Sequence, residues 1–145
     1  MSVFSLKSAL MARHAQHVVL IHFPIALFIV GVFFDFVATF IKNATLAKAA
    51  FYNFCMAAVS TVPVVITGLL AWHFALEGAP LKGILLWHLL AGLASTIMLI
   101  AVARIHWVCQ HGRVLPSWRL FLEFIAVGVI GLTGHLGGFL SGVNV

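Results

Sequence analysis

The chain has 145 residues, of which 63% are hydrophobic and 8% charged, and its mean hydropathy is +1.18. A soluble domain of this length cannot bury so much apolar surface, so the composition indicates an integral membrane protein. Its apolar surface is expected to contact the lipid bilayer. The net charge of +5 comes from single lysines and arginines between apolar runs, which fits loops beside a membrane and excludes a nucleic-acid-binding surface. Two cysteines without a CxxC motif give no support to a disulfide framework or a covalently attached c-type haem.

The predicted elements begin with a short helix in the membrane interface, because residues 2–13 mix apolar and basic side chains. Four apolar runs follow, and each reaches about the 20 residues that a helix needs to cross the hydrocarbon core. These predicted spans cover residues 18–41, 49–76, 84–103 and 119–140. No linker is long enough to divide the chain. We therefore expect an all-α fold with one transmembrane domain of residues 1–145, an integral membrane four-helix up-down bundle with a short N-terminal interfacial helix.

Two prolines fall inside the predicted spans. Pro24 directly follows His22 and Phe23, so either His22 lies just before the main part of the first helix or a kink there frees a backbone carbonyl. Irregular backbone at membrane depth is tolerated only where protein or a cavity covers it. Pro63 predicts a second kink, in the span of residues 49–76.

The distribution of lysine and arginine predicts the orientation of the bundle. Five basic residues lie in or beside the first and third loops: Lys42, Lys48, Arg104, Arg113 and Arg119. Three lie on the N-terminal side and in the second loop: Lys7, Arg13 and Lys82. This difference predicts a multi-pass protein of the bacterial inner membrane with both termini on the periplasmic side.

Histidines occur in all four predicted spans. Because successive spans cross the membrane in opposite directions, we expect these histidines to lie at the same depth. His22 lies near the start of the first span, His73 near the end of the second, His88 early in the third and His135 late in the fourth. His17 lies on the same side, nearer the surface. Ionisable side chains inside lipid are costly, so a shared layer of imidazoles predicts a site at this depth.

Two classes of ligand fit this layer of histidines. Haem b needs imidazoles on facing helices and space for a flat macrocycle, and small residues near the histidines would supply that space: Gly92, Gly134 and Gly138. Copper or zinc is the alternative, although Glu77 is the only carboxylate on this side. Each histidine could instead hydrogen-bond a neighbouring carbonyl or hydroxyl, and the glycines could serve close helix packing.

The opposite side of the bundle carries charged residues inside the spans. We expect Asp35 to form a structural ion pair with Arg104 or Arg119. Arg119 and Glu123 are spaced i,i+4 and could instead pair with each other. Two further histidines are expected to face headgroups or water on this side: His106 and His111.

Several motifs resemble the DUF2231 family of small bacterial membrane proteins. The segment from His17 to Leu27, HVVLIHFPIAL, is similar to the family's H-P-x-x-V-H-F-P-I-A-L, and Thr133 to Gly138, TGHLGG, is similar to its closing T-G-x-x-G-G. Phe34-Asp35, Thr67-Gly68 and His88 are further matches. The resemblance covers nearly the whole chain and implies a four-helix membrane domain. It brings no activity, because the family's function is unknown.

The resemblance also separates the histidines into two groups. Four fall on family-like positions: His17, His22, His88 and His135. His73 does not, Val18 stands where the family usually has proline, and residues 69–71 lack the aspartate that tends to follow the T-G pair. If that aspartate helps to make the family's site, the site of this chain differs and His73 is the substitute.

These patterns predict that the protein is a small cytochrome b-like membrane subunit. We expect it to bind haem b between pairs of histidines and to pass electrons near the periplasmic side. We expect it to contact other subunits of a membrane redox complex. The predicted ligands are His17, His22, His73, His88 and His135. The alternatives are a transition-metal or small-ligand binding module and a non-catalytic structural subunit of a larger membrane complex. An electron carrier or accessory subunit is expected rather than a stand-alone catalyst, because the three acids Asp35, Glu77 and Glu123 are spread over both sides.

Overall fold

The structure, a computed structural model, describes residues 13–74, 76–110 and 114–141 of the chain. Every regular element within these residues is an α-helix, so the predicted all-α class is confirmed. The helices are α2 (Arg13–Leu20), α3 (His22–Ile41), α4 (Ala44–Phe74), α5 (Gly83–Gln110) and α6 (Arg119–Leu140). The predicted interfacial helix of residues 2–13 lies outside the described residues, apart from Arg13, with which α2 begins.

Four helical segments are long and apolar enough to cross a membrane, as the sequence predicts. They are Gln16–Ile41, Ala44–Phe74, Gly83–Gln110 and Arg119–Leu140. The sequence-based boundaries were too narrow at two charged residues, since α4 already includes Lys48 and α5 continues through Arg104. Both side chains are exposed, and a long basic side chain can extend toward the interface while its backbone stays helical.

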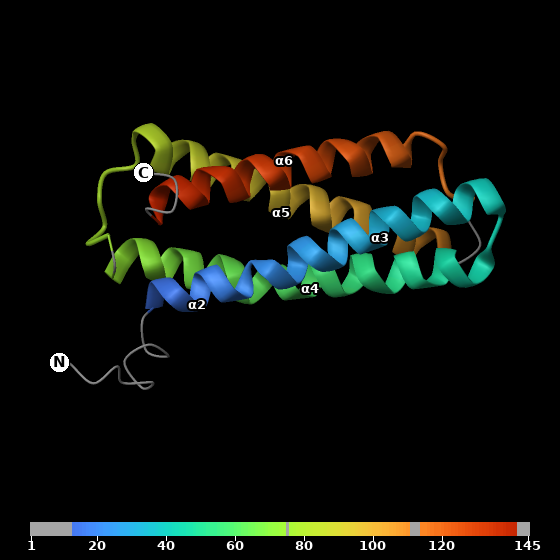
Figure 1. The fold of residues 1–145 in the computed structure, drawn as a ribbon, viewed down its shortest axis with the longest axis horizontal. Coiled ribbons are helices and arrows are strands. Elements are labelled where there is room, and N and C mark those ends of the chain that lie inside the picture. Colours follow the sequence, from blue (N-terminus) through green and yellow to red (C-terminus); the bar gives the residue numbers. More distant parts are fainter. Residues whose placement is uncertain (1–12, 75, 111–113, 142–145) are drawn as a thin grey trace.

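The helix that starts the first span is interrupted at Ile21, one turn from Pro24. Proline has no backbone N–H and cannot donate to the carbonyl of Leu20, and the next bond in the series, from Ile25 N to Ile21 O, is 3.4 Å long. α2 ends at Leu20 and α3 begins at His22, so Ile21 alone separates the two helices and His22 lies inside α3. α2 and α3 still follow one another along nearly the same line (Figure 1). The second proline, Pro63, is accommodated inside α4, which stays helical from Ala44 to Phe74.

The chain forms two antiparallel helix hairpins. α3, with α2 before it, packs along α4, and α5 packs along α6, while contacts between α4 and α5 and between α3 and α6 join the hairpins. Figure 1 shows α2, the end of α4, the start of α5 and the end of α6 at one end of the bundle. We call this the histidine end, and the histidines whose side chains the structure describes there are His17, His22, His73, His88 and His135. The opposite end is the charged end, and its buried polar residues include Asp35, His106, Arg119 and Glu123.

The buried core is distributed unevenly along the bundle. Its apolar members run from the middle of the helices toward the charged end: Phe28, Val32, Ala50, Phe54, Ala57, Leu99, Val102, Ala103, Ala126 and Ile130. The Phe28 and Phe54 rings meet at its centre, 5.3 Å apart between centroids. At the histidine end, the buried residues within the described ranges are two small ones, Pro24 and Ala71. The inner surfaces of the helices are therefore less covered by the chain itself at the histidine end.

Candidate functional site

The up-down threading brings the histidines to one end of the bundle, but their side chains have different surroundings. His22, His73 and His135 are exposed. His22 Nδ1 donates to the backbone oxygen of Val18 at 2.7 Å. The His73 ring contacts Phe74 and the His135 ring contacts Phe139, both edge to face. These three imidazoles contact residues of their own helix or of the adjoining one.

His17 and His88, in contrast, are half-buried against the second helix of their own hairpin. His17 Nδ1 lies 3.1 Å from the backbone oxygen of Val64 on α4, and Thr67 Oγ1 is 3.3 Å away. The ring rests on Gly68, where an added Cβ would approach His17 Cε1 to 3.0 Å. Only glycine leaves room for the imidazole at this distance from the α4 backbone.

His88 repeats this arrangement in the second hairpin. Its Nδ1 lies 3.1 Å from the backbone oxygen of Thr133 on α6, and an added Cβ on Gly137 would come within 3.1 Å of His88 Cε1. In both hairpins the glycine follows the accepting residue by one helical turn, Val64 to Gly68 and Thr133 to Gly137. We call these two arrangements the histidine seats. A carbonyl oxygen can only accept a hydrogen bond, so in each seat Nδ1 carries the proton and donates.

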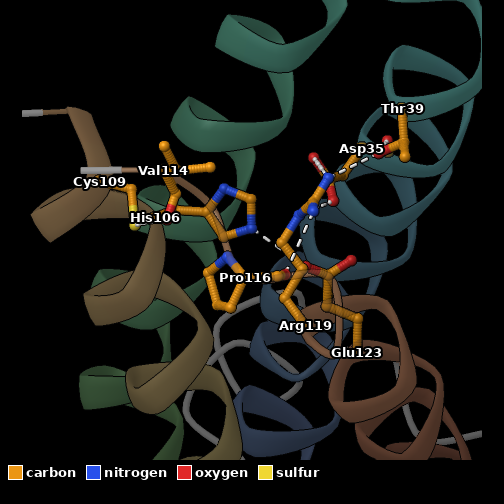
Figure 2. Close-up of polar contacts among 8 residues, drawn as sticks. All are labelled: Asp35, Thr39, His106, Cys109, Val114, Pro116, Arg119 and Glu123. Atoms are coloured by element: carbon orange, nitrogen blue, oxygen red, sulfur yellow. Dashed lines mark hydrogen bonds and ion pairs between the residues drawn. The ribbon is translucent and has the colours of Figure 1, made fainter. Parts of the chain in front are cut away.

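The charged end contains a buried ion pair between the two hairpins (Figure 2). Arg119 Nε donates to Asp35 Oδ2 at 2.8 Å, and Arg119 Nη2 donates to Asp35 Oδ1 at 3.3 Å and to Thr39 Oγ1 at 2.6 Å. Arg119 Nη1 donates to the backbone oxygen of Pro116 at 3.3 Å. This geometry confirms the predicted structural pair of Asp35 with Arg119, while Arg104, the other candidate, is exposed.

Next to this ion pair, His106 on α5 faces Glu123 on α6. The distance from His106 Nε2 to Glu123 Oε1 is 3.0 Å, and the two side chains are 2% and 0% exposed. The His106 ring also packs on Phe54 of α4, with 4.6 Å between ring centroids. Glu123 Oε2 is buried and has no hydrogen-bond partner. The expectation that His106 faces headgroups or water is therefore wrong, because α5 continues past Arg104 and turns His106 into the bundle; His111 lies outside the described residues.

The structure also brings the carboxylates of Asp35 and Glu123, which the sequence places at the same end, close to one another. Ligand atoms of Asp35, His106 and Glu123 all lie within 4.8 Å of one another. Within the described residues, these three side chains are the ones that could together hold a metal ion. The alternative pair of Arg119 with Glu123, four residues apart on α6, does not form. The Arg119 guanidinium binds Asp35 on α3 instead. Glu77, the third acid, is exposed in the loop after α4.

The family comparison covers both ends of this bundle. A family model described as a predicted membrane protein, DUF2231, matches residues 13–143. The chain belongs to the DUF2231 family. The match extends from the first residue of α2 past the end of α6, so both histidine seats and the buried charges lie within this DUF2231 domain. No curated protein and no solved structure matches the chain.

The glycines of this DUF2231 chain separate into those that touch a histidine and those that do not. Of the three that the sequence analysis singled out, Gly92 lies on α5 opposite Thr133 of α6, where an added Cβ would come within 3.8 Å of the Thr133 methyl group, an ordinary packing contact. Gly134 borders open space, and Gly138 accepts a bond from the hydroxyl group of Ser141 through its backbone oxygen. The sequence did not indicate that Gly68 and Gly137 lie beneath histidine rings, although both lie in family-like motifs, because spacing along one helix does not reveal which glycine a ring on another helix contacts.

An apolar groove of about 230 Å³ lies between α4 and α5, halfway along the bundle. Its lining residues are Ala58, Thr61, Val62, Val65, Ile66, Thr96 and Ile100. None of the histidines borders it. The groove therefore offers no nitrogen ligand to a metal or a haem.

Proposed function

We propose that this DUF2231 protein is a small membrane cytochrome, a subunit that binds haem b and passes electrons near the periplasmic side of the bacterial inner membrane. The observation that carries the proposal is the pair of matched histidine seats, one in each hairpin. His17 and His88 are the proposed axial ligands. The excess of lysine and arginine in the first and third loops supports the periplasmic placement of this end.

The seats have the hydrogen-bonding pattern expected of ligating histidines. A histidine bound to a metal almost always donates its other ring N–H to a carbonyl, carboxylate or water, which fixes the tautomer and the orientation of the ring. In both seats Nδ1 is the donor, so Nε2 is the nitrogen that carries the lone pair in the neutral imidazole. The glycine beneath each ring sets how closely the imidazole approaches the helix behind it.

The uneven distribution of the buried core supports the presence of a bound ligand at the histidine end. The apolar side chains that fill the bundle between its middle and the charged end have no counterparts of similar size at the histidine end, where Pro24 and Ala71 are the buried residues within the described ranges. An apolar, flat macrocycle would cover inner helix surfaces that the chain leaves less covered.

Haem fits the donor set of this end better than a bare copper or zinc ion. A bare ion is usually held by three or four protein ligands, whereas a haem iron needs only one or two axial histidines. In the part of the chain that the structure describes, the group of three potential ligands lies at the charged end and includes none of the predicted histidine ligands. The haem would supply the electron transfer, and the protein would supply axial ligands, burial and the hydrogen bonds of Nδ1, which tune the reduction potential.

The test is the visible spectrum of the purified protein in detergent, oxidised and then reduced with dithionite. We expect Soret and α bands of a low-spin b-type haem in the wild-type protein. His17→Ala and His88→Ala should abolish these bands or change them to those of a five-coordinate haem. His73→Ala is the matched control, because His73 is exposed at the same end and contacts only its neighbour Phe74 among the contacts described above.

Three results would contradict the proposal. A wild-type protein without haem bands after expression with ample haem would exclude the cytochrome, and copper or zinc bound in stoichiometric amounts would then favour the metal-binding alternative. Unchanged bands in both seat variants would show that haem is bound elsewhere. Loss of the bands only in His22→Ala, His73→Ala or His135→Ala would assign ligation to the exposed histidines instead of the seats.

A further inference from the structure

The buried charges at the charged end do not balance. Asp35 and Arg119 neutralise each other through two hydrogen bonds. Glu123 is left with His106 as its bonding partner, at 3.0 Å, and both side chains are almost completely buried. With Glu123 ionised and His106 neutral, the cluster would hold two negative charges and one positive charge away from water. A buried charge without compensation is strongly unfavourable.

Glu123 also has one unmatched oxygen atom. Oε1 is bonded to His106 Nε2, whereas Oε2 is buried without any hydrogen-bond partner. An ionised carboxylate normally accepts several hydrogen bonds, and leaving a buried acceptor without a donor carries its full desolvation cost. One additional proton removes the charge imbalance, either on His106, which then faces the carboxylate as an imidazolium, or on Glu123, which then becomes a neutral acid.

Among the described residues, the groups around this pair do not provide the missing positive charge. On α3, Asp35 is itself an acid and is bonded to Arg119. On α6, the guanidinium of Arg119 already donates to Asp35, Thr39 and Pro116. On α4, the neighbour of His106 is the apolar ring of Phe54. The basic side chains Lys48 of α4 and Arg104 of α5 are exposed.

We infer that His106 and Glu123 form a buried proton-binding site, which takes up one proton when the bundle folds and holds it at neutral pH. The site is separate from the histidine seats and does not depend on haem. A proton fits the cluster better than a divalent cation. Asp35 would have to serve as the third ligand, but Arg119 occupies both its oxygens, and the guanidinium would lie beside the added cation.

Infrared and ¹⁵N NMR spectroscopy of the wild-type protein in lipid nanodiscs at neutral pH would locate the proton directly. The expected result is either a carboxylic acid C=O band that shifts in D₂O and disappears in Glu123→Gln, or the ¹⁵N shifts of a doubly protonated His106. Glu77→Gln is the control, because Glu77 is exposed at the other end of the bundle. An ionised Glu123 beside a neutral His106 would overturn the inference, and so would a stoichiometric divalent metal ion in the purified protein.

The pH dependence of unfolding provides a second test. Above the pH at which histidine deprotonates in the unfolded chain, the folded state would hold one proton more than the unfolded state, so stability falls as pH rises. The unfolding equilibrium constant should then increase by up to about tenfold per pH unit, the slope for one proton. Glu123→Gln, which removes the excess negative charge, should flatten this dependence, and Glu77→Gln should preserve it. A wild-type slope in Glu123→Gln would overturn the inference.

Discussion

The two ends of the bundle use polar side chains in different ways. At the charged end, Arg119 of α6 binds Asp35 of α3, so a buried ion pair joins the two hairpins. At the histidine end, His17 is bonded to α4 and His88 to α6, so each seat lies within one hairpin. At the charged end, the chain itself therefore links the two hairpins. At the histidine end each seat belongs to one hairpin, so a ligand that contacts both seats could link them.

Among the variants that test this difference between the two ends, Arg119→Ala is expected to have the largest effect on stability. The substitution leaves Asp35 buried without its partner, and removing one member of a buried ion pair typically costs about 3–5 kcal/mol of stability. We expect a marked drop in the thermal unfolding midpoint in detergent. The double variant Arg119→Met/Asp35→Asn removes both charges and should recover part of the loss. A double variant that is no more stable than Arg119→Ala would contradict the importance of the unpaired charge.

Gly31→Ala tests the packing that supports the charged end. An added Cβ would lie 2.8 Å from the Phe54 ring and 3.3 Å from Asn53 Cβ, both on α4. Overpacking of this kind costs about 1–3 kcal/mol. Gly131→Ala is the matched control, because an added Cβ there meets nothing within 4 Å and a helical alanine is favoured over glycine. Equal unfolding midpoints for the two variants would contradict the close α3–α4 contact.

Gly137→Ala tests the histidine seat without removing the imidazole. The new Cβ would lie 3.1 Å from His88 Cε1, so the ring must shift by a few tenths of an ångström and lengthen its bond to the Thr133 carbonyl. We expect a shifted reduction potential and altered visible bands, with little change in stability. Gly134→Ala, one turn earlier on α6 and bordered by open space, should leave both unchanged. Identical spectra and potentials for the two variants would contradict the role of the seat.

The smallest effect on stability is expected from His73→Ala. His73 is exposed, and its described contact is the edge of the neighbouring Phe74 ring. Exposed substitutions away from buried networks usually change stability by about 0.5 kcal/mol or less. The thermal unfolding midpoint should therefore stay within error of the wild-type value. A large decrease would show that His73 has a buried partner in the membrane.

The sequence was sufficient to predict the four long helices, their alternating directions and the end of the bundle at which the described histidines lie, because these follow from apolar length and alternation of direction. It also predicted an ion pair of Asp35 with Arg104 or Arg119, since a buried acid needs a base at the same depth, and the structure shows that Arg119 is the partner. It did not predict that His106 is buried or that Gly68 and Gly137 lie beneath the histidines. Those features depend on the rotation of each helix about its axis, and helices that are apolar on all sides give little indication of which face turns inward.

The uneven core has a consequence for the order of assembly. Since the interdigitated aromatic and aliphatic side chains lie between the middle and the charged end, that half can close as soon as the two hairpins meet in the bilayer. The half that holds the seats needs no such closure for the hairpins to stay associated. Under the proposed function, insertion of the polypeptide and the later binding of haem would therefore be separable events.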